Sequence, residues 1–151
     1  MFTLWTLKRK ILSNIERDFV IKEKDMKRCE MRELAFKTIY SKFFNPSEDD
    51  FEKIFDKADK ESLEFTSDIL KNFAEHYDEI NEIISKNLKG YTVDRLFKID
   101  LAILIVAVIE LKYLKNPKEV VINEAVELAK KYSTDKSPKF INGLLADIVK
   151  Q

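Results

Sequence analysis

Apolar residues recur every three or four positions along most of this chain, which is the spacing of amphipathic helices. Such stripes run through residues 3–21, 27–44, 60–75 and 77–88. Asn45-Pro46 ends the second stripe, because proline cannot continue the hydrogen-bond ladder of a helix. Ser47 is expected to cap a further short helix through its hydroxyl. The pattern therefore predicts a chain that is helical almost throughout.

One predicted helix differs from the others because it has no polar face. All nine residues from Leu101 to Ile109 are apolar, within a helical pattern that extends from about Asp94 to Leu114. A helix that is apolar all round must be covered on every side, so we expect this one at the centre of the core. Its β-branched residues also fit a buried strand, but the flanking pattern favours a helix.

The last two predicted helices carry start signals. Asn116-Pro117 and Ser137-Pro138 each place a capping residue before a proline, which fits the first position of a helix. Apolar residues then continue at helical spacing to the end of the chain. Within the last helix, Asn142-Gly143 is a pair that packing alone would not select.

The composition excludes several kinds of site. The chain has two glycines, too few for a glycine-rich phosphate loop, and a single cysteine, Cys29, which excludes an internal disulfide. With His76 as the one histidine, the usual Cys/His zinc site cannot be built. No nucleophile-and-base arrangement is apparent either. We therefore predict no catalytic residues, no metal and no cofactor, and a protein that is not an enzyme.

The apolar segments are too short for a membrane. The longest run has nine residues, whereas a spanning helix needs about twenty. At the N-terminus the apolar residues precede Lys8, Arg9 and Lys10, which is the reverse of a secretory signal. The sequence predicts a cytoplasmic protein with no membrane association.

Charge is distributed unevenly although the net charge is zero. Residues 1–42 carry +5, residues 43–100 carry −7 and residues 101–151 carry +2. If the two ends meet, they form a basic face that attracts phosphates, although a solvated helix surface is the plainer interpretation. The candidate phosphate-binding side chains are Lys27, Arg28, Arg32, Lys136 and Lys139.

Phe140 stands beside two of these lysines at the start of the last helix. An aromatic ring next to lysines is typical of a platform on which the bases of single-stranded RNA stack. Helical periodicity alone favours core packing for this ring. Both interpretations stay open from the residues themselves.

At this point the sequence resembles a known family. The C-terminal segment reads VVINEAVELAKKY followed by KFINGLL, and it is similar to the C-terminal signature of the NusB family. DRLFKIDLAILIVAVIEL and MRELAFKTIY resemble the central and first helices of that family. The resemblance implies an all-helical fold of two three-helix bundles packed at an angle. It also implies binding of boxA RNA in ribosomal RNA leaders together with the ribosomal protein NusE, in the complex that helps RNA polymerase read through terminators.

The resemblance also assigns residues to surfaces. The arginine-rich stretch of the family falls on Arg28 and Arg32, with Lys27 adjacent, whereas Cys29 and Glu30 depart from it. The RNA-facing loop falls on residues 135–140, where Lys136, Lys139 and Phe140 keep suitable chemistry, and Phe140 is then expected to stack. The NusE-facing surface falls on Tyr40, Asp100 and Glu110.

Two further expectations concern the backbone. Ser133 stands where the family usually ends a helix with glycine, so strain is expected at that turn. Gly143 is expected to allow close packing behind the RNA edge.

The domain organisation follows from where the resemblance begins. Residues 26–151 are predicted to form the NusB-like RNA-binding domain, and residues 1–25 an additional amphipathic helix, unless translation starts at Met26. Two other functions stay open. One is an RNA-binding module that acts with a ribosomal RNA methyltransferase, and the other is a homodimeric helical scaffold.

Overall fold

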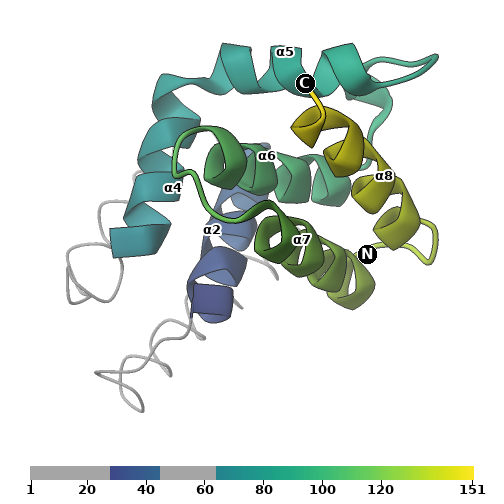
Figure 1. Ribbon diagram of the computed structural model, residues 1–151. Helices are drawn as coiled ribbons and strands as arrows, with labels where there is room; N and C mark the ends of the chain where they lie inside the picture. Colours follow the sequence, from purple (N-terminus) through teal and green to yellow (C-terminus); the bar gives the residue numbers. More distant parts are fainter. Residues whose placement is uncertain (1–27, 45–63) are drawn as a thin grey trace. The chain divides into compact units, whose positions relative to one another are not determined.

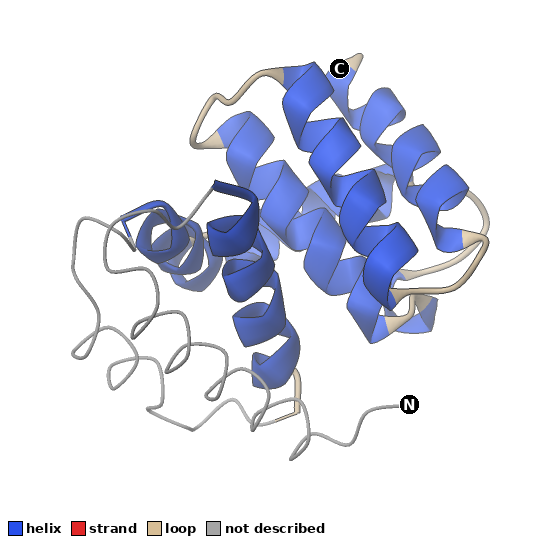
Figure 2. Cartoon of the chain, turned by 90° about the horizontal axis from the view of Figure 1, so that it is seen from below, coloured by secondary structure: helices blue, strands red, loops and turns tan. Residues whose placement is uncertain are grey.

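The computed structural model describes residues 28–44 and 64–151, and every regular element in these ranges is a helix (Figures 1 and 2). The predicted all-α class is therefore confirmed. The expected helices at residues 3–21 and after Ser47 lie outside the described residues. The elements are α2 (Arg28–Lys42), α4 (Glu64–Glu75), α5 (Tyr77–Asn87), the 3-10 turn η1 (Val93–Arg95), α6 (Lys98–Lys112), α7 (Lys118–Tyr132) and α8 (Ser137–Val149).

The chain divides into two compact units, residues 1–70 and residues 71–151. In the described part of the first unit, α2 and the beginning of α4 are joined by a hydrogen bond that the Thr66 hydroxyl donates to the Met31 carbonyl at 2.9 Å. Leu34, Ala35 and Ile39 are buried on α2, as its apolar stripe predicts.

The second unit is built around α6, which packs against α5, α7 and α8 (Figure 1). Each residue from Leu101 to Ile109 is at most 3% exposed. The prediction of a central buried helix is confirmed, and the alternative of a buried strand is wrong. No described helix has the length and apolarity that a membrane span requires.

The connection from α6 to α7 differs in detail from the predicted capping. Pro117 rather than Asn116 is the N-cap of α7, and it has no side chain that can cap. Asn116 instead bonds Glu110, donating from its backbone N–H to the carbonyl at 3.0 Å and from its side-chain Nδ2 to Oε1 at 3.1 Å. Because Glu110 is 0% exposed, its need for a hydrogen-bond donor outweighs the helix cap.

Lys115, in the same connection, has φ +55°, the one left-handed backbone at a non-glycine residue in the described chain. Glycine is the usual residue at such a helix end, since a side chain makes this conformation costly. Ser133, where strain was expected, has an extended backbone with φ −109°. The expectation for Ser133 is therefore wrong, and the strain lies at Lys115.

A polar network on the surface joins α5 to the end of α6. The Glu79 carboxylate accepts hydrogen bonds from the Lys112 ammonium and, at 2.6 Å, from the Tyr113 hydroxyl. The His76 ring stacks on Tyr113 with 4.4 Å between ring centroids. The hydrogen bonds from Lys112 and Tyr113 lower the pKa of Glu79, while burial and the bond to Glu79 raise the pKa of Tyr113 to about 12.

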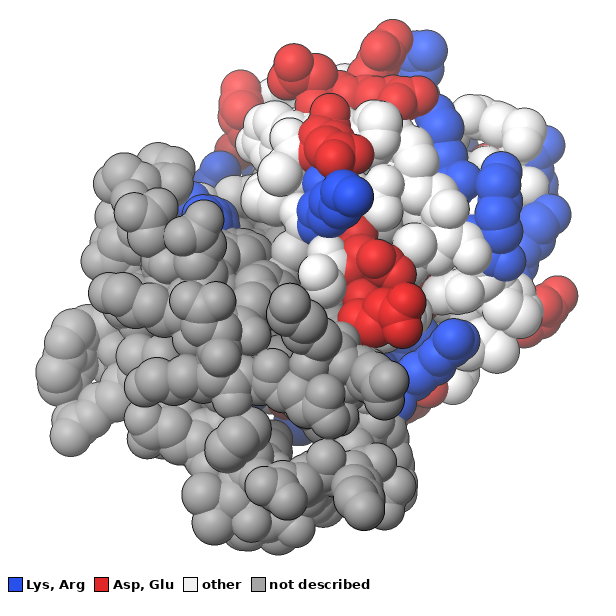
Figure 3. Space-filling model, turned by 90° about the vertical axis from the view of Figure 1, so that its left-hand side faces the viewer, with Lys and Arg blue, Asp and Glu red and all other residues white. Residues whose placement is uncertain are grey.

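Acidic side chains gather along the upper edge of the face in Figure 3, over α5.

Glu79→Gln is expected to lower Tm at neutral pH and to leave Tm unchanged in strong acid. The lowered pKa of Glu79 means that its contribution is present above the ordinary value of 4.5 and is lost as the pH falls through the folded-state pKa. Thermal unfolding followed by circular dichroism from acid to neutral pH measures this. Glu82→Gln is the control, since Glu82 has an exposed partner on its own helix, Lys86 at 3.1 Å. A Tm difference that persists unchanged in acid contradicts the assignment.

Candidate nucleic-acid interface

The start of α8 presents two basic side chains at the positive end of a helix dipole. Lys136 is the N-cap residue, Pro138 lies in the first turn, and Lys136 and Lys139 are both exposed. The Ser137 N–H donates to the Thr134 carbonyl at 3.1 Å and Pro138 has no N–H, so the side chains and the dipole, rather than a row of backbone donors, favour anions here. Two lysines at this position add positive charge where a phosphate is already favoured.

A cluster of hydroxyl groups fixes the loop that precedes α8. Ser133 and Ser137 donate hydrogen bonds to the two oxygens of the Asp100 carboxylate, at 2.5 and 3.0 Å. The Thr134 hydroxyl lies 2.8 Å from that of Ser137 and can donate to it, because Ser137 already gives its own proton to Asp100. Asp100 is 4% exposed, so its charge is covered by these donors. The loop is thereby anchored to the first turn of α6.

Two aromatic rings from different segments meet beside the lysines. Tyr91, in the loop after α5, lies with its ring centroid 6.3 Å from that of Phe140, at an interplanar angle of 33°. Tyr91 is 38% exposed and Phe140 is half-buried, so Phe140 both packs and remains accessible. Partial burial, with the Asp100 carboxylate nearby, raises the pKa of Tyr91 above its usual range.

Tyr91 was not among the residues that sequence reasoning selected. The available signal was an isolated aromatic after Gly90, a glycine with φ +87° in a polar loop. Helical periodicity says nothing about a residue in a loop. Its position next to Phe140 depends on the packing of α5, α6 and α8, which no local pattern contains.

The predicted arginines lie in the first unit and are described by themselves. The guanidinium carbons of Arg28 and Arg32 lie 5.2 and 5.4 Å from the centroid of the Phe65 ring, within the range of a cation–π interaction. Arg28 is exposed, whereas Arg32 is 4% exposed. Arg28 is therefore the more accessible of the two for a phosphate. Lys27 lies outside the described residues.

The three residues assigned to the NusE-facing surface are all buried within the chain itself. Tyr40 is 8%, Asp100 4% and Glu110 0% exposed. Asp100 holds the hydroxyl cluster, Glu110 holds Asn116, and burial raises the pKa of Tyr40. Their role toward a partner stays a prediction. Among them, Tyr40 is next to an accessible apolar residue, since its ring meets that of the 48%-exposed Phe44 at 5.1 Å.

Gly143 has no close neighbour that would require a glycine. A Cβ atom built on it meets nothing within 4 Å among the described residues, and the residue is exposed. The expectation of close packing at Gly143 is therefore wrong.

Gly143→Ala is expected to raise the free energy of unfolding by about 0.5–1 kcal/mol, because alanine loses less backbone entropy in a helix. Urea unfolding of the variant and the parent protein measures the difference. Gly90→Ala is the opposite control, since its φ of +87° strains any residue with a Cβ. A destabilised Gly143→Ala protein would contradict the open space around this position.

Comparison with known proteins decides the family. The model of the NusB family matches residues 29–150, which is most of the chain. This chain belongs to the NusB family. The start of α8, with its lysines, Phe140 and the anchored loop, thus lies within a NusB fold.

Individual members show how far the similarity extends. The transcription antitermination protein NusB of Finegoldia magna is 43% identical over 132 residues, covering 83% of this chain and 96% of that protein. The solved structure of NusB from T. maritima has a TM-score of 0.77 at 34% identity, covering 85% of this chain and 94% of that one. A crystal structure of the antitermination factors NusB and NusE in complex with double-stranded RNA has a TM-score of 0.71 at 29% identity, covering 83% and 98%.

Within the described residues, no group of three or more His, Cys, Asp or Glu side chains is placed to hold a metal ion. The described polar residues of this NusB chain at the start of α8 are two lysines, three hydroxyl residues and the exposed Asp135. Lysines and hydroxyls are groups that bind anions.

Proposed function

We propose that this protein is a transcription antitermination factor that binds boxA RNA of ribosomal RNA leader transcripts together with NusE. In this role it supports read-through by RNA polymerase, acts in the cytoplasm and works by binding rather than by catalysis. The observation that carries the proposal is the anchored start of α8. There Lys136 and Lys139 precede a half-exposed Phe140 inside a NusB fold.

The chemistry of this surface supports RNA as the ligand. The lysines bind phosphates, while the exposed parts of Phe140 and Tyr91 offer rings on which bases can stack. The Asp100 carboxylate is buried and bonded to two hydroxyls, so it anchors the loop and does not contact the RNA itself. The solved complex of NusB, NusE and RNA supports NusE as the partner.

The double variant Lys136→Ala/Lys139→Ala is expected to bind boxA RNA about tenfold more weakly at low salt. Each phosphate contact that is lost should also reduce the slope of log affinity against log salt by about 0.7 for single-stranded RNA. Fluorescence anisotropy with labelled boxA RNA at several salt concentrations, with and without NusE, measures both quantities.

Lys86→Ala is the matched control for this experiment. Lys86 is an exposed lysine of α5 and is paired with Glu82 on the same helix. Its removal should leave the affinity within about twofold, as expected for a charge outside the contact. Unchanged affinity and salt slope in the double variant would place the RNA site elsewhere. Comparison with Arg28→Ala then tests the first unit, because Arg28 is exposed and its loss leaves the core intact.

A further inference from the structure

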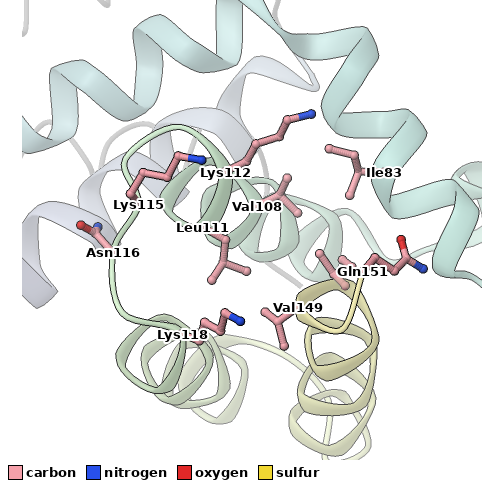
Figure 4. Close-up of a pocket in the computed structure, with 10 residues that line it drawn as sticks. Ile83, Val108, Leu111, Lys112, Lys115, Asn116, Lys118, Val149 and Gln151 are labelled. Atoms are coloured by element: carbon pink, nitrogen blue, oxygen red, sulfur yellow. The ribbon is translucent and has the colours of Figure 1, made fainter.

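A hollow of about 560 Å³ lies in the second unit, away from the start of α8, where α5, the ends of α6 and α8, and the start of α7 meet. Its floor is apolar and aliphatic, with Val108 and Leu111 at the back and Ile83 and Val149 beside them (Figure 4). Lys115 and Lys118 stand on one side, and Gln151 stands opposite (Figure 4). The site combines an apolar interior with a basic rim.

The rim carries positive charge that the described chain does not neutralise. Lys112 also lines the hollow, but it is paired with Glu79. The side chains of Lys115 and Lys118 have no hydrogen bond or ion pair with any described residue, and no Asp or Glu is among the lining residues. The two ammonium groups therefore place positive charge at the hollow that no described carboxylate balances, which favours a ligand with carboxylates or other anions.

The backbone provides a second, independent observation. Lys115 is held at φ +55° between α6 and the Asn116–Glu110 hydrogen bonds. Asn116 itself lines the hollow, so these bonds fix its wall as well as its rim. Glycine would adopt this conformation without strain, but it would bring no ammonium group. A strained residue that is held in place by its surroundings is a feature that concentrates at binding sites.

The lining also discriminates between kinds of anion. Nucleic-acid bases bind by stacking on aromatic rings or on arginine, and none of the residues that line this hollow is either. Aliphatic side chains instead accept an apolar anchor, and a hollow of this size holds one or two side chains. The opposite wall is fixed, because Gln151 donates to the Asn87 side chain at 2.9 Å.

We propose that this hollow binds an acidic segment of a partner protein. The segment inserts an aliphatic or aromatic side chain over Val108 and Leu111 and sets its flanking carboxylates against Lys115 and Lys118. This site is distinct from the start of α8, so that RNA and the acidic segment bind at the same time. The partner is defined by this chemistry of one apolar anchor between acidic residues.

The test uses the full chain and short fluorescent peptides with a central Leu or Phe flanked on both sides by Glu and Ser. One matched set replaces the central residue by Gly, and another replaces every Glu by Lys. Fluorescence anisotropy should show binding of the acidic peptides with an apolar centre and at least tenfold weaker binding of both matched sets. Rising salt should weaken the binding without abolishing it, because the apolar anchor is insensitive to screening.

The decisive variant is Lys115→Glu/Lys118→Glu, which should keep the fold because both residues are exposed. It should weaken peptide binding about tenfold or more, while boxA RNA binding stays within about twofold. Lys71→Glu/Lys130→Glu carries the same charge change at exposed lysines that do not line the hollow, and it should bind the peptides as the parent does.

Three outcomes overturn the proposal. One is that no acidic peptide with an apolar centre binds more tightly than its Gly-centred match. Another is that the Lys115→Glu/Lys118→Glu protein binds the peptides as the parent does. The third concerns other ligands, tested with laurate as a fatty acid and with a single-stranded RNA. If one of these binds the parent protein and is no longer bound by the Lys115→Glu/Lys118→Glu protein, while no peptide binds either protein, the hollow is not a peptide site. Because RNA binding at α8 is measured in the same proteins, failure of this site and failure of the proposed function are distinguishable.

Discussion

Asp100→Ala is expected to lower the free energy of unfolding by about 3 kcal/mol. The carboxylate is 4% exposed and accepts hydrogen bonds from Ser133 and Ser137. Alanine removes the acceptor of the buried Ser137 hydroxyl and of the half-buried Ser133 hydroxyl, and an unsatisfied buried polar group costs about 1–3 kcal/mol. Denaturant unfolding of the full chain measures the loss. Because the loop 133–137 loses its anchor, its amide hydrogens should also exchange faster than those of α6.

Asp135→Ala is the matched control, since Asp135 is an exposed aspartate in the same loop. Its removal should change the free energy of unfolding by no more than about 0.5 kcal/mol. Asp100→Asn should fall between the two, because the amide oxygen still accepts one hydrogen bond. Equal stability of the Asp100→Ala and Asp135→Ala proteins would show that the hydroxyl cluster contributes nothing to folding.

Ile105→Ala should destabilise the protein by a similar amount, about 2–5 kcal/mol. Ile105 is 0% exposed at the middle of α6, which is covered by α5, α7 and α8. Truncation removes buried methyl groups and leaves a cavity that neighbours on several sides cannot all move to fill. The same denaturant unfolding experiment measures the effect, and Ile105→Val should cost about 1 kcal/mol.

Val120→Ala serves as the control for this position. Val120 is also β-branched and helical, but it is 48% exposed on α7. Its truncation should change stability by no more than about 0.5 kcal/mol. If Ile105→Ala were as mild as Val120→Ala, α6 would not be the packing centre of the second unit.

The helices were predictable because each one carries its own pattern. The apolar run of α6 and the stripes of α7 and α8 are local, and burial follows from them without knowledge of the partner helix. The residue at which each helix begins was less predictable. Asn116 was expected to cap α7, but the buried Glu110 takes its donors instead. A local preference is overruled when a buried polar group requires hydrogen-bond donors.

The candidate site also combines residues that a local pattern predicts with residues that only the tertiary structure brings in. Lys136, Lys139 and Phe140 come from one continuous segment, so that sequence alone places them together. Asp100 and Tyr91 reach that segment from α6 and from the loop after α5. Hydrogen bonds between residues far apart in sequence leave no periodic trace. For that reason the hydroxyl of Ser133 was seen as a missing glycine rather than as a donor to Asp100.

The burial of α6 on all sides has a consequence for synthesis on the ribosome. Two of the helices that cover α6, α7 and α8, follow it in the sequence within residues 113–151 and are therefore translated after it. At about 5–20 residues per second, the run from Leu101 to Ile109 waits roughly 2–8 s before its covering helices are complete. Once the run has left the ribosome, its apolar side chains are a site for a chaperone or for a second nascent chain until α7 and α8 pack on it. The most deeply buried part of the finished protein is thus the part of the unfinished one that most needs cover.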